Sequence, residues 1–521
     1  MAEVVATRRD WVIVIAAIVV FLLHCAVYLQ YTVDDSLISY RFARNWAEGF
    51  GPVYNPGERV EGYTCFGWVA LLAAAHRVGL DMESTSKAMG IAAGVVCILA
   101  AAALSRRLLD GRSTYLVAPL VLALSPLFAA WACSGMETAL FAALIACSAW
   151  AMAVDESRQT VVPIAAVVLG TATFVRPDGM LLAAVALAAI AVGRDKRAGR
   201  RAPLRWAATY AAIVAPYMIW RAAYYGSLVP NTYLAKTGRG PERLVSGAWC
   251  CANFAEYSGL ALAALCVIGL WTPAPRMTAW RFVRMALGAF GAYVIWTGGD
   301  ILHIRFFVHV MGLLAVCAAV GFDRVAYFDA TARAGPFSTR GSRVPRIAMC
   351  CALGIAWAAT AVVQDFRALH ARDQYGAAYV VNNARNVTLA NIPLGKWLAA
   401  HAPTDATAAV WDIGGVGYYS NLRIIDLYGL TDSTLARMIH CHASDARKVA
   451  YVESRRPDYI VAYAGRGGAN LQWLEPLVAQ YRLLSYWRGG PDGYGLALLV
   501  RNSTAECSRL TKSSKLRKST S

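Results

Sequence analysis

The chain has 521 residues, of which 58% are hydrophobic and only 16% are charged. Long uncharged runs recur along it, which excludes an ordinary soluble protein and favours a polytopic membrane protein that is mainly α-helical. The formal net charge is +18, but the arginines and lysines lie in short loops between the apolar runs. Because this distribution is typical of a chain oriented in a membrane by its positive loops, we predict a lipid bilayer and no nucleic acid as a partner.

The apolar runs predict about eleven membrane crossings. They lie near residues 11–31, 86–105, 114–131, 136–153, 160–175, 179–193, 206–223, 257–271, 283–297, 303–322 and 347–363. No small-residue cleavage site follows the first run, so we predict a retained helix. The basic loops, of which 194–205 is the strongest, alternate correctly if the N-terminus is cytoplasmic. This orientation places every candidate motif outside, and the abundance of Ala and Arg indicates a bacterial inner (plasma) membrane.

The composition changes near residue 364, where a second kind of structure is predicted. Short apolar or alternating runs predict strands at 406–414, 422–429, 458–465 and 495–502, and the segment 435–455 predicts a helix. We therefore expect a transmembrane domain at 1–363, an extracytoplasmic α/β domain at 364–502 and a disordered basic tail at 503–521. The motif DIGGVG at 412–417 does not match a full dinucleotide fingerprint and is predicted to be a strand-to-turn connection.

Two adjacent carboxylates, Asp34 and Asp35, follow the first crossing directly. The next residues, 36–48, carry apolar side chains on one side and polar ones on the others, which predicts a short helix in the membrane interface. A turn at 55–57 and a second, partly buried helix at 63–74 are predicted to follow. The acidic pair has two readings: it caps the helix N-terminus, or one carboxylate acts as a general base at the membrane surface.

These residues and several later motifs resemble a known family. The short first crossing, the acidic pair at its outer end and the helix sequence SYRFARN are similar to the polytopic C-type glycosyltransferases. Within them, DDSLISYRFARNWAEG and YNPGERVEGYT resemble the branch that includes the mycobacterial terminal arabinofuranosyltransferases. The motifs SGMETALF at 134–141, PNTYLAKTG at 230–238, GGDILHIRFFVHV at 298–310 and DIGGVGYYSNLRIIDLYGLTD at 412–432 fit that branch in order. The resemblance does not identify the sugar.

The resemblance implies a transmembrane catalytic domain that moves a sugar, for which arabinofuranose is one candidate, from a polyprenyl-phosphate donor to a cell-wall or cell-surface glycan or glycolipid acceptor. Such a transfer needs a general base for the acceptor proton and positive charge beside the leaving phosphate. We predict Asp34 and Asp35 as catalytic residues, and the sequence does not decide between them. Residues predicted to bind the donor phosphate or the substrate are Arg41, Arg176, Asn231, Tyr233, Lys236 and Arg305. For Arg305, a bidentate contact with phosphate competes with simple extension of its charge toward lipid headgroups.

Further polar residues are predicted to line the same cavity. They are Glu61, Glu137, Asp178, Asp300 and His303. Glu137 and Asp178 begin predicted crossings, so helix capping is their alternative role. Asp300 and His303 are suitable ligands for a divalent cation, but two ligands do not define a metal site. The sequence therefore assigns no cofactor and leaves a divalent cation open.

Two other classes of function compete with sugar transfer. A lipid or glycan flippase or transporter predicts inverted repeats and charges near the membrane midplane, and the sequence shows neither. A non-catalytic glycan-binding membrane scaffold leaves the acidic pair without a role.

Overall fold

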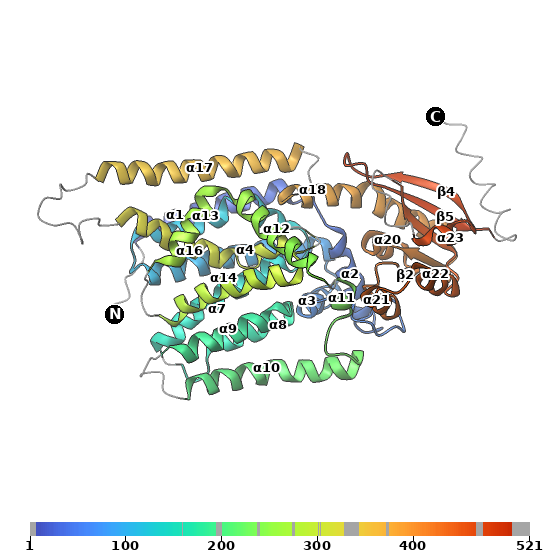
Figure 1. Ribbon diagram of the computed structural model, residues 1–521, viewed down its shortest axis with the longest axis horizontal. Coiled ribbons are helices and arrows are strands. Elements are labelled where there is room, and N and C mark those ends of the chain that lie inside the picture. The colour runs from blue at the N-terminus through green and yellow to red at the C-terminus, as the bar shows by residue number, and fades with distance from the viewer. Residues whose placement is uncertain are drawn as a thin grey trace, which may run out of the picture.

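A computed structural model describes most of the chain. The described residues are 7–158, 160–193, 201–236, 240–272, 277–300, 302, 304–327, 343–370, 375–464 and 473–502. Figure 1 shows a bundle of long, roughly parallel helices with a small α/β domain at one end. Short helices lie between the bundle and this domain. The predicted tail at 503–521 lies outside the described residues.

The bundle contains most of the helices. They are α1 (Arg8–Tyr28), α4 (Met82–Leu108), the 3-10 helix η1 (Ser113–Leu116), α5 (Val117–Ala123), α6 (Pro126–Cys133), α7 (Thr138–Arg158), α8 (Ile164–Val175), α9 (Asp178–Val192), α10 (Ala202–Tyr225), α12 (Glu242–Ser258), α13 (Leu260–Trp271), α14 (Thr278–Thr297), α15 (Arg305–Val308), α16 (Met311–Tyr327) and α17 (Arg343–His370). Within the described ranges, α1, α4 and α7 are long and apolar enough to cross a membrane, and two bent helix pairs raise the number to five. The mainly helical fold is confirmed, but the predicted count of eleven crossings is not.

Breaks within apolar runs account for part of this difference. The run predicted as one crossing at 114–131 bends by 54° between α5 and α6. There Ser125 accepts a hydrogen bond from the Phe128 amide, and Pro126 begins α6. The pair α12 and α13 bends by 111° at Gly259, which has a φ of 83° that favours glycine. The apolar sequence continues across the bend between α5 and α6, so the sequence pattern does not reveal that bend. Helix α12 is less apolar than α13 and lies almost entirely before the crossing predicted at 257–271.

Three short helices connect the bundle to the α/β domain. They are α2 (Asp34–Ala47), α3 (Phe66–Arg77) and α11 (Asn231–Lys236). Helix α2 begins two residues before the predicted start, so the acidic pair forms its first turn. Its N-cap residue is Val33, which has no capping side chain. Neither acid is therefore the N-cap residue, although both lie in the first turn, where negative charge is favoured by the helix dipole.

The α/β domain is built around one mixed sheet. Its elements are α18 (Ala377–Asn386), the π-helix η3 (Val387–Asn391), α19 (Ile392–His401), β1 (Thr407–Val410), α20 (Ile413–Ser420), β2 (Arg423–Asp426), α21 (Ser433–His440), α22 (Asp445–Ser454), β3 (Tyr459–Tyr463), α23 (Glu475–Val478), β4 (Tyr481–Arg488) and β5 (Gly495–Arg501). The strand order is β2-β1-β3-β5-β4, with β1 parallel to β2 and β3 and with β5 antiparallel to β3 and β4. The four predicted strands are present.

Three details of this domain differ from the predictions. Strand β4 lies at the edge of the sheet and was not predicted, because its sequence YRLLSYWR mixes polar and apolar residues. The segment 435–455 forms parts of two helices, separated at His442, whose φ is 52°. The predicted boundary at residue 364 lies inside α17, which ends at His370. The globular elements begin with α18.

The two faces of the sheet have different roles. One face shares a buried apolar cluster with α2 and α3, which includes Phe42 and Trp68 together with Ile424 and Val461. The other face is covered by α22 and α23. Because α2 is packed into the core of the domain, the position of the acidic pair depends on the fold of the chain after residue 377.

Candidate active site

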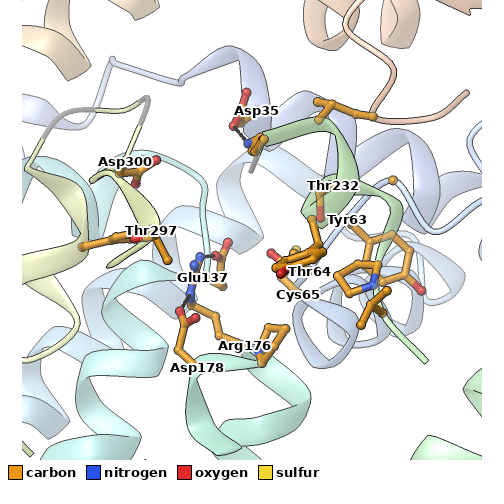
Figure 2. Close-up of a pocket in the computed structure, with 18 of the residues that line it drawn as sticks. Asp35, Tyr63, Thr64, Cys65, Glu137, Arg176, Asp178, Thr232, Thr297 and Asp300 are labelled. Carbon is orange, nitrogen blue, oxygen red and sulfur yellow. Dashed lines mark hydrogen bonds and ion pairs between the residues drawn. The ribbon is translucent and has the colours of Figure 1, made fainter. Parts of the chain in front are cut away.

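A cavity of about 280 Å³ lies between the bundle and the short helices (Figure 2). Its wall comes from segments far apart in the sequence, including α2, the turn between α8 and α9, the end of α10, α11, the end of α14 and the start of α15. Predicted site residues that line it are Asp35, Glu137, Arg176, Asp178, Tyr233, Lys236, Asp300 and Arg305. Asp34, Arg41, Glu61 and Asn231 do not line it. His303 lies outside the described residues.

Asp35 is the member of the acidic pair that reaches the cavity. Its carboxylate lies 3.8 Å from the ammonium nitrogen of Lys236, and about a quarter of each side chain is exposed. At this distance the contact is a loose ion pair that an entering ligand can separate. Asp35 is therefore placed to exchange a proton with a group in the cavity.

Asp34 points away from the cavity into the α/β domain. Its two carboxylate oxygens accept hydrogen bonds from the amides of Gly414 (2.9 Å) and Gly415 (2.8 Å), at the N-terminus of α20. The Asn391 side chain donates a third, at 3.2 Å. Burial and nearby Asp412 raise the pKa of Asp34 to about 7, against the opposing effect of the two amides. The DIGGVG motif is thus the start of a helix that binds an anion, the Asp34 carboxylate, and the predicted strand-to-turn connection is wrong.

We expect Gly414→Ala to separate α2 from the α/β domain. A Cβ at this position contacts the Asp34 backbone oxygen and lies 2.5 Å from its Oδ2, closer than real Cβ atoms approach. Overpacking of this kind costs about 1–3 kcal/mol. Thermal unfolding of the detergent-solubilised protein should show a clear loss of stability, with Gly288→Ala as the control because a Cβ there meets open space. Equal melting temperatures for the two variants would contradict this role of Asp34.

Arg176 forms the floor of the cavity with two acids. Its guanidinium contacts Glu137 at 2.6 Å and Asp178 at 2.8 Å, and all three side chains are almost fully buried. Tyr293 donates a 2.7 Å hydrogen bond to Asp178. The two carboxylates keep Arg176 charged and raise its pKa. A cation held by two acids is a fixed part of the wall. Glu137 and Asp178 are therefore partners of Arg176 and not isolated helix caps.

Arg305 is paired with Asp300 on the opposite side of the cavity. The Nε atom of Arg305 donates to Asp300 at 2.7 Å, whereas its Nη1 donates to the weakly accepting sulfur of Met136, and the guanidinium lies over the Trp131 ring. Burial disfavours the Asp300 carboxylate, but Arg305 and Lys236 outweigh it and hold the pKa of Asp300 below its usual value. The outer edge of the Arg305 guanidinium is therefore available to an oxygen ligand.

Three other predicted residues hold the structure together around the cavity. Arg41 is buried and donates to the carbonyl oxygens of Tyr54, Gly417 and Leu422 and to the side chain of Asn55. Its donors are already in use, so the structure contradicts the predicted phosphate-binding role of Arg41.

Asn231 and Glu61 have similar supporting positions. Asn231 donates to the carbonyl oxygens of Gly429 (2.7 Å) and Leu430 (3.0 Å), which joins α11 to the α/β domain. Glu61 accepts a 2.7 Å contact from Arg221, and burial raises its pKa to about 7. Asn231 was predicted to bind substrate and Glu61 to line the cavity. Neither residue lines it, and both instead stabilise the structure around it.

Several lining residues were not predicted. They include Tyr63, Thr64, Cys65, Arg221, Thr232, Tyr293 and Thr297. Arg221 had a detectable signal, since it is a charge at the end of a long apolar run, and such charges are typical of functional positions. The hydroxyl groups carry no comparable signal. In the part of the chain that the structure describes, no three His, Cys, Asp or Glu side chains converge as metal ligands.

Comparisons with known proteins find matches to two family models and to a curated relative. Residues 68–220 match the family model described as dolichyl-phosphate-mannose-protein mannosyltransferase, and residues 377–505 match a domain of unknown function. A terminal β-(1→2)-arabinofuranosyltransferase of Mycobacterium tuberculosis is 32% identical over 228 residues. This match covers 41% of the chain and 36% of the relative, so it spans little more than a third of the relative's own length.

Two solved structures are similar over nearly the whole chain. ArnT from Cupriavidus metallidurans, bound to undecaprenyl phosphate, has a TM-score of 0.59 at 13% identity, covering 94% of this chain and 98% of that one. The Archaeoglobus fulgidus oligosaccharyltransferase in the apo form has a TM-score of 0.59 at 13% identity, covering 95% of this chain and 75% of that one. The resemblance predicted from the sequence is thus confirmed: the chain has the fold of the polytopic C-type glycosyltransferases.

Proposed function

We propose that the protein is an integral membrane glycosyltransferase that moves a sugar from a polyprenyl-phosphate donor to a hydroxyl group of a glycan or glycolipid. The observation that carries this proposal is the meeting of Asp35, Lys236 and Arg305 on the wall of one cavity. The Asp35 carboxylate supplies a proton acceptor, and Lys236 and Arg305 supply a phosphate site. Of these two cations, Arg305 is tightly paired with an acid and Lys236 is not.

Asp35 acts as the general base in this reaction. It takes the proton of the acceptor hydroxyl while the acceptor oxygen forms a bond to the anomeric carbon of the donor sugar. The bond between that carbon and the phosphate oxygen breaks, and its electron pair leaves with the polyprenyl phosphate. The position of Asp34, held by the amides of Gly414 and Gly415, supports the assignment of Asp35 over Asp34.

Lys236 and Arg305 stabilise the leaving phosphate. When the donor binds, the Lys236 ammonium moves from Asp35 to a phosphate oxygen, because the contact of 3.8 Å is weak and both side chains are partly exposed. This movement separates the Asp35 carboxylate from its cation and leaves it free to accept the proton of the acceptor hydroxyl. Arg305 stays paired with Asp300 and donates to the phosphate from its outer edge.

The cavity lies at the outer face of the membrane in this proposal. It occupies the end of the bundle next to the α/β domain, and the basic loops predict that this end is extracytoplasmic (Figure 1). A lipid-linked donor suits that side, since nucleotide sugars are confined to the cytoplasm. The likeness to a terminal β-(1→2)-arabinofuranosyltransferase supports arabinofuranose as the sugar. The family resemblance of the sequence implies decaprenyl-phosphoryl arabinofuranose as the donor and cell-wall arabinan as the acceptor.

A transfer assay tests the proposal. Purified protein in lipid nanodiscs is incubated with an arabinan oligosaccharide and, in parallel, with several polyprenyl-phosphate sugars and the corresponding nucleotide sugars. We expect the acceptor to gain sugar from a lipid-linked donor, with arabinofuranose the most efficient, and not from a nucleotide sugar. Failure with every lipid-linked donor, or transfer from a nucleotide sugar, would contradict the proposal.

A further inference from the structure

Two buried oxygen atoms in the cavity wall have no hydrogen-bond partner among the described residues. They are Oε2 of Glu137 and Oγ1 of Thr232. Glu137 is 1% exposed and Thr232 is 7% exposed, and both residues line the cavity. A buried polar atom without a partner destabilises the folded state, so proteins keep one where a ligand or another group supplies the missing hydrogen bond.

The surroundings of Thr232 differ from the phosphate side of the cavity. In Figure 2, Thr232 lies on the same side as Tyr63, Thr64 and Cys65, whereas Asp300 and Thr297 lie on the opposite side. The first group is uncharged and offers hydroxyl and thiol groups, while the cations Lys236 and Arg305 pair with acids elsewhere on the wall. The wall rich in hydroxyl groups thus faces Asp300 and Thr297 across the cavity, and Glu137 lies between the two sides beside Arg176 (Figure 2).

The two unpartnered oxygens have complementary hydrogen-bonding capacity. The Oε1 atom of Glu137 is occupied by Arg176 at 2.6 Å, so Oε2 remains as a charged acceptor for a ligand hydroxyl. The Thr232 hydroxyl both donates and accepts. Its residue belongs to α11, the same short helix that carries Lys236. A ligand whose phosphate contacts Lys236 therefore extends along one helix toward Thr232.

We propose that Glu137 and Thr232 form a subsite that binds the hydroxyl groups of a sugar ring. This inference rests on the proposed function and adds the part of the cavity that recognises the sugar. Glu137 accepts a hydrogen bond from one hydroxyl group, and Thr232 bonds a second. The sugar belongs to the lipid-linked donor or to the acceptor, and the two sources offer the same chemistry.

Binding measurements on an isosteric variant test the subsite. Thr232→Val removes an oxygen that has no partner in the free protein, so it should leave stability unchanged or higher. Thr297→Val is the matched control, because Thr297 lines the same cavity but its hydroxyl donates to the carbonyl oxygen of Tyr293 at 3.0 Å. Calorimetry on the whole protein in nanodiscs uses three ligands: polyprenyl phosphate, a polyprenyl-phosphoryl arabinofuranose and an arabinan oligosaccharide.

We expect Thr232→Val to weaken binding of one sugar-bearing ligand roughly tenfold, as for loss of a hydrogen bond, and to leave polyprenyl phosphate unaffected. A loss of affinity for the lipid-linked sugar assigns the subsite to the donor. A loss of affinity for the oligosaccharide assigns it to the acceptor. Glu137→Gln should weaken the same ligand, and Thr297→Val should weaken none. Unchanged binding of both sugars, or an equal loss with polyprenyl phosphate, would overturn the subsite. These affinities do not depend on turnover, so failure of transfer in the wild-type protein is a separate result that counts only against the proposed function.

Discussion

Replacement of Asp35 by Asn is expected to lower the rate of sugar transfer by about 10²–10⁴-fold, the usual contribution of a general base. The amide keeps the size of the side chain but does not take up a proton. Asp35 is partly exposed and its ion pair with Lys236 is loose, so the variant should fold and insert as the wild type does. Transfer rates at saturating donor and acceptor, together with melting temperatures, measure the two effects separately.

Asp34→Asn is the matched comparison, because it makes the same change one residue away. Asn offers one acceptor oxygen where the Asp34 carboxylate accepts from both Gly414 and Gly415. We expect this variant to lose stability, whereas Asp35→Asn keeps its stability and loses turnover. Normal turnover in Asp35→Asn, with turnover lost in a stably folded Asp34→Asn, would reverse the assignment of the base.

Replacement of Arg305 by Lys is expected to weaken donor binding or turnover by about 1–3 kcal/mol, which is the range for a charge-assisted hydrogen bond. Lys keeps the positive charge beside Asp300, and it reaches lipid headgroups as well as Arg does. It does not offer the planar pair of donors that a phosphate accepts. A purified variant titrated with a lipid-linked donor at fixed acceptor measures the loss.

Arg305→Ala is less informative because it removes the partner of a buried carboxylate. Asp300 has a side-chain exposure of 4%, and an unpaired charge at such a site costs about 3–5 kcal/mol of stability. The lysine variant avoids this problem. If it is indistinguishable from the wild type across the titration, Arg305 does not bind phosphate bidentately, and Lys236 becomes the main phosphate ligand.

The sequence was sufficient to locate the cavity but not to assign roles within it. Asp34 and Asp35 are neighbours on α2, and successive helical residues point about 100° apart, so one faces the cavity and the other the α/β domain. Contacts with Gly414 and Gly415 decide which of the two residues faces the cavity. These glycines lie 380 and 381 residues after Asp34 in the chain. A local pattern contains no information about such a contact.

Arg41 illustrates the same limit. It lies on a predicted interfacial helix beside the acidic pair, which made it a reasonable phosphate ligand. In the fold, the carbonyl oxygens of Gly417 and Leu422 accept hydrogen bonds from its guanidinium. These acceptors are backbone atoms of the α/β domain, and any sequence offers backbone carbonyls, so only the tertiary structure identifies them.

The helices were predicted more reliably than their breaks. Long apolar runs mark where the chain lies in the bundle, and α1, α4 and α7 follow them closely. The 54° bend at Ser125 and the 111° bend at Gly259 occur inside such runs. Hydropathy does not distinguish a straight helix from a bent pair, which is one reason that the structure does not confirm the count of eleven crossings.

The central claim is that Asp35, Lys236 and Arg305 form the reaction site for a lipid-linked sugar. A cryo-electron microscopy structure of the protein in nanodiscs with bound polyprenyl phosphate tests it most directly. The account predicts phosphate density inside the cavity, within hydrogen-bonding distance of Arg305 and Lys236, and a Lys236 ammonium that has moved away from Asp35. Phosphate density outside the cavity, with Lys236 still beside Asp35, would contradict the account.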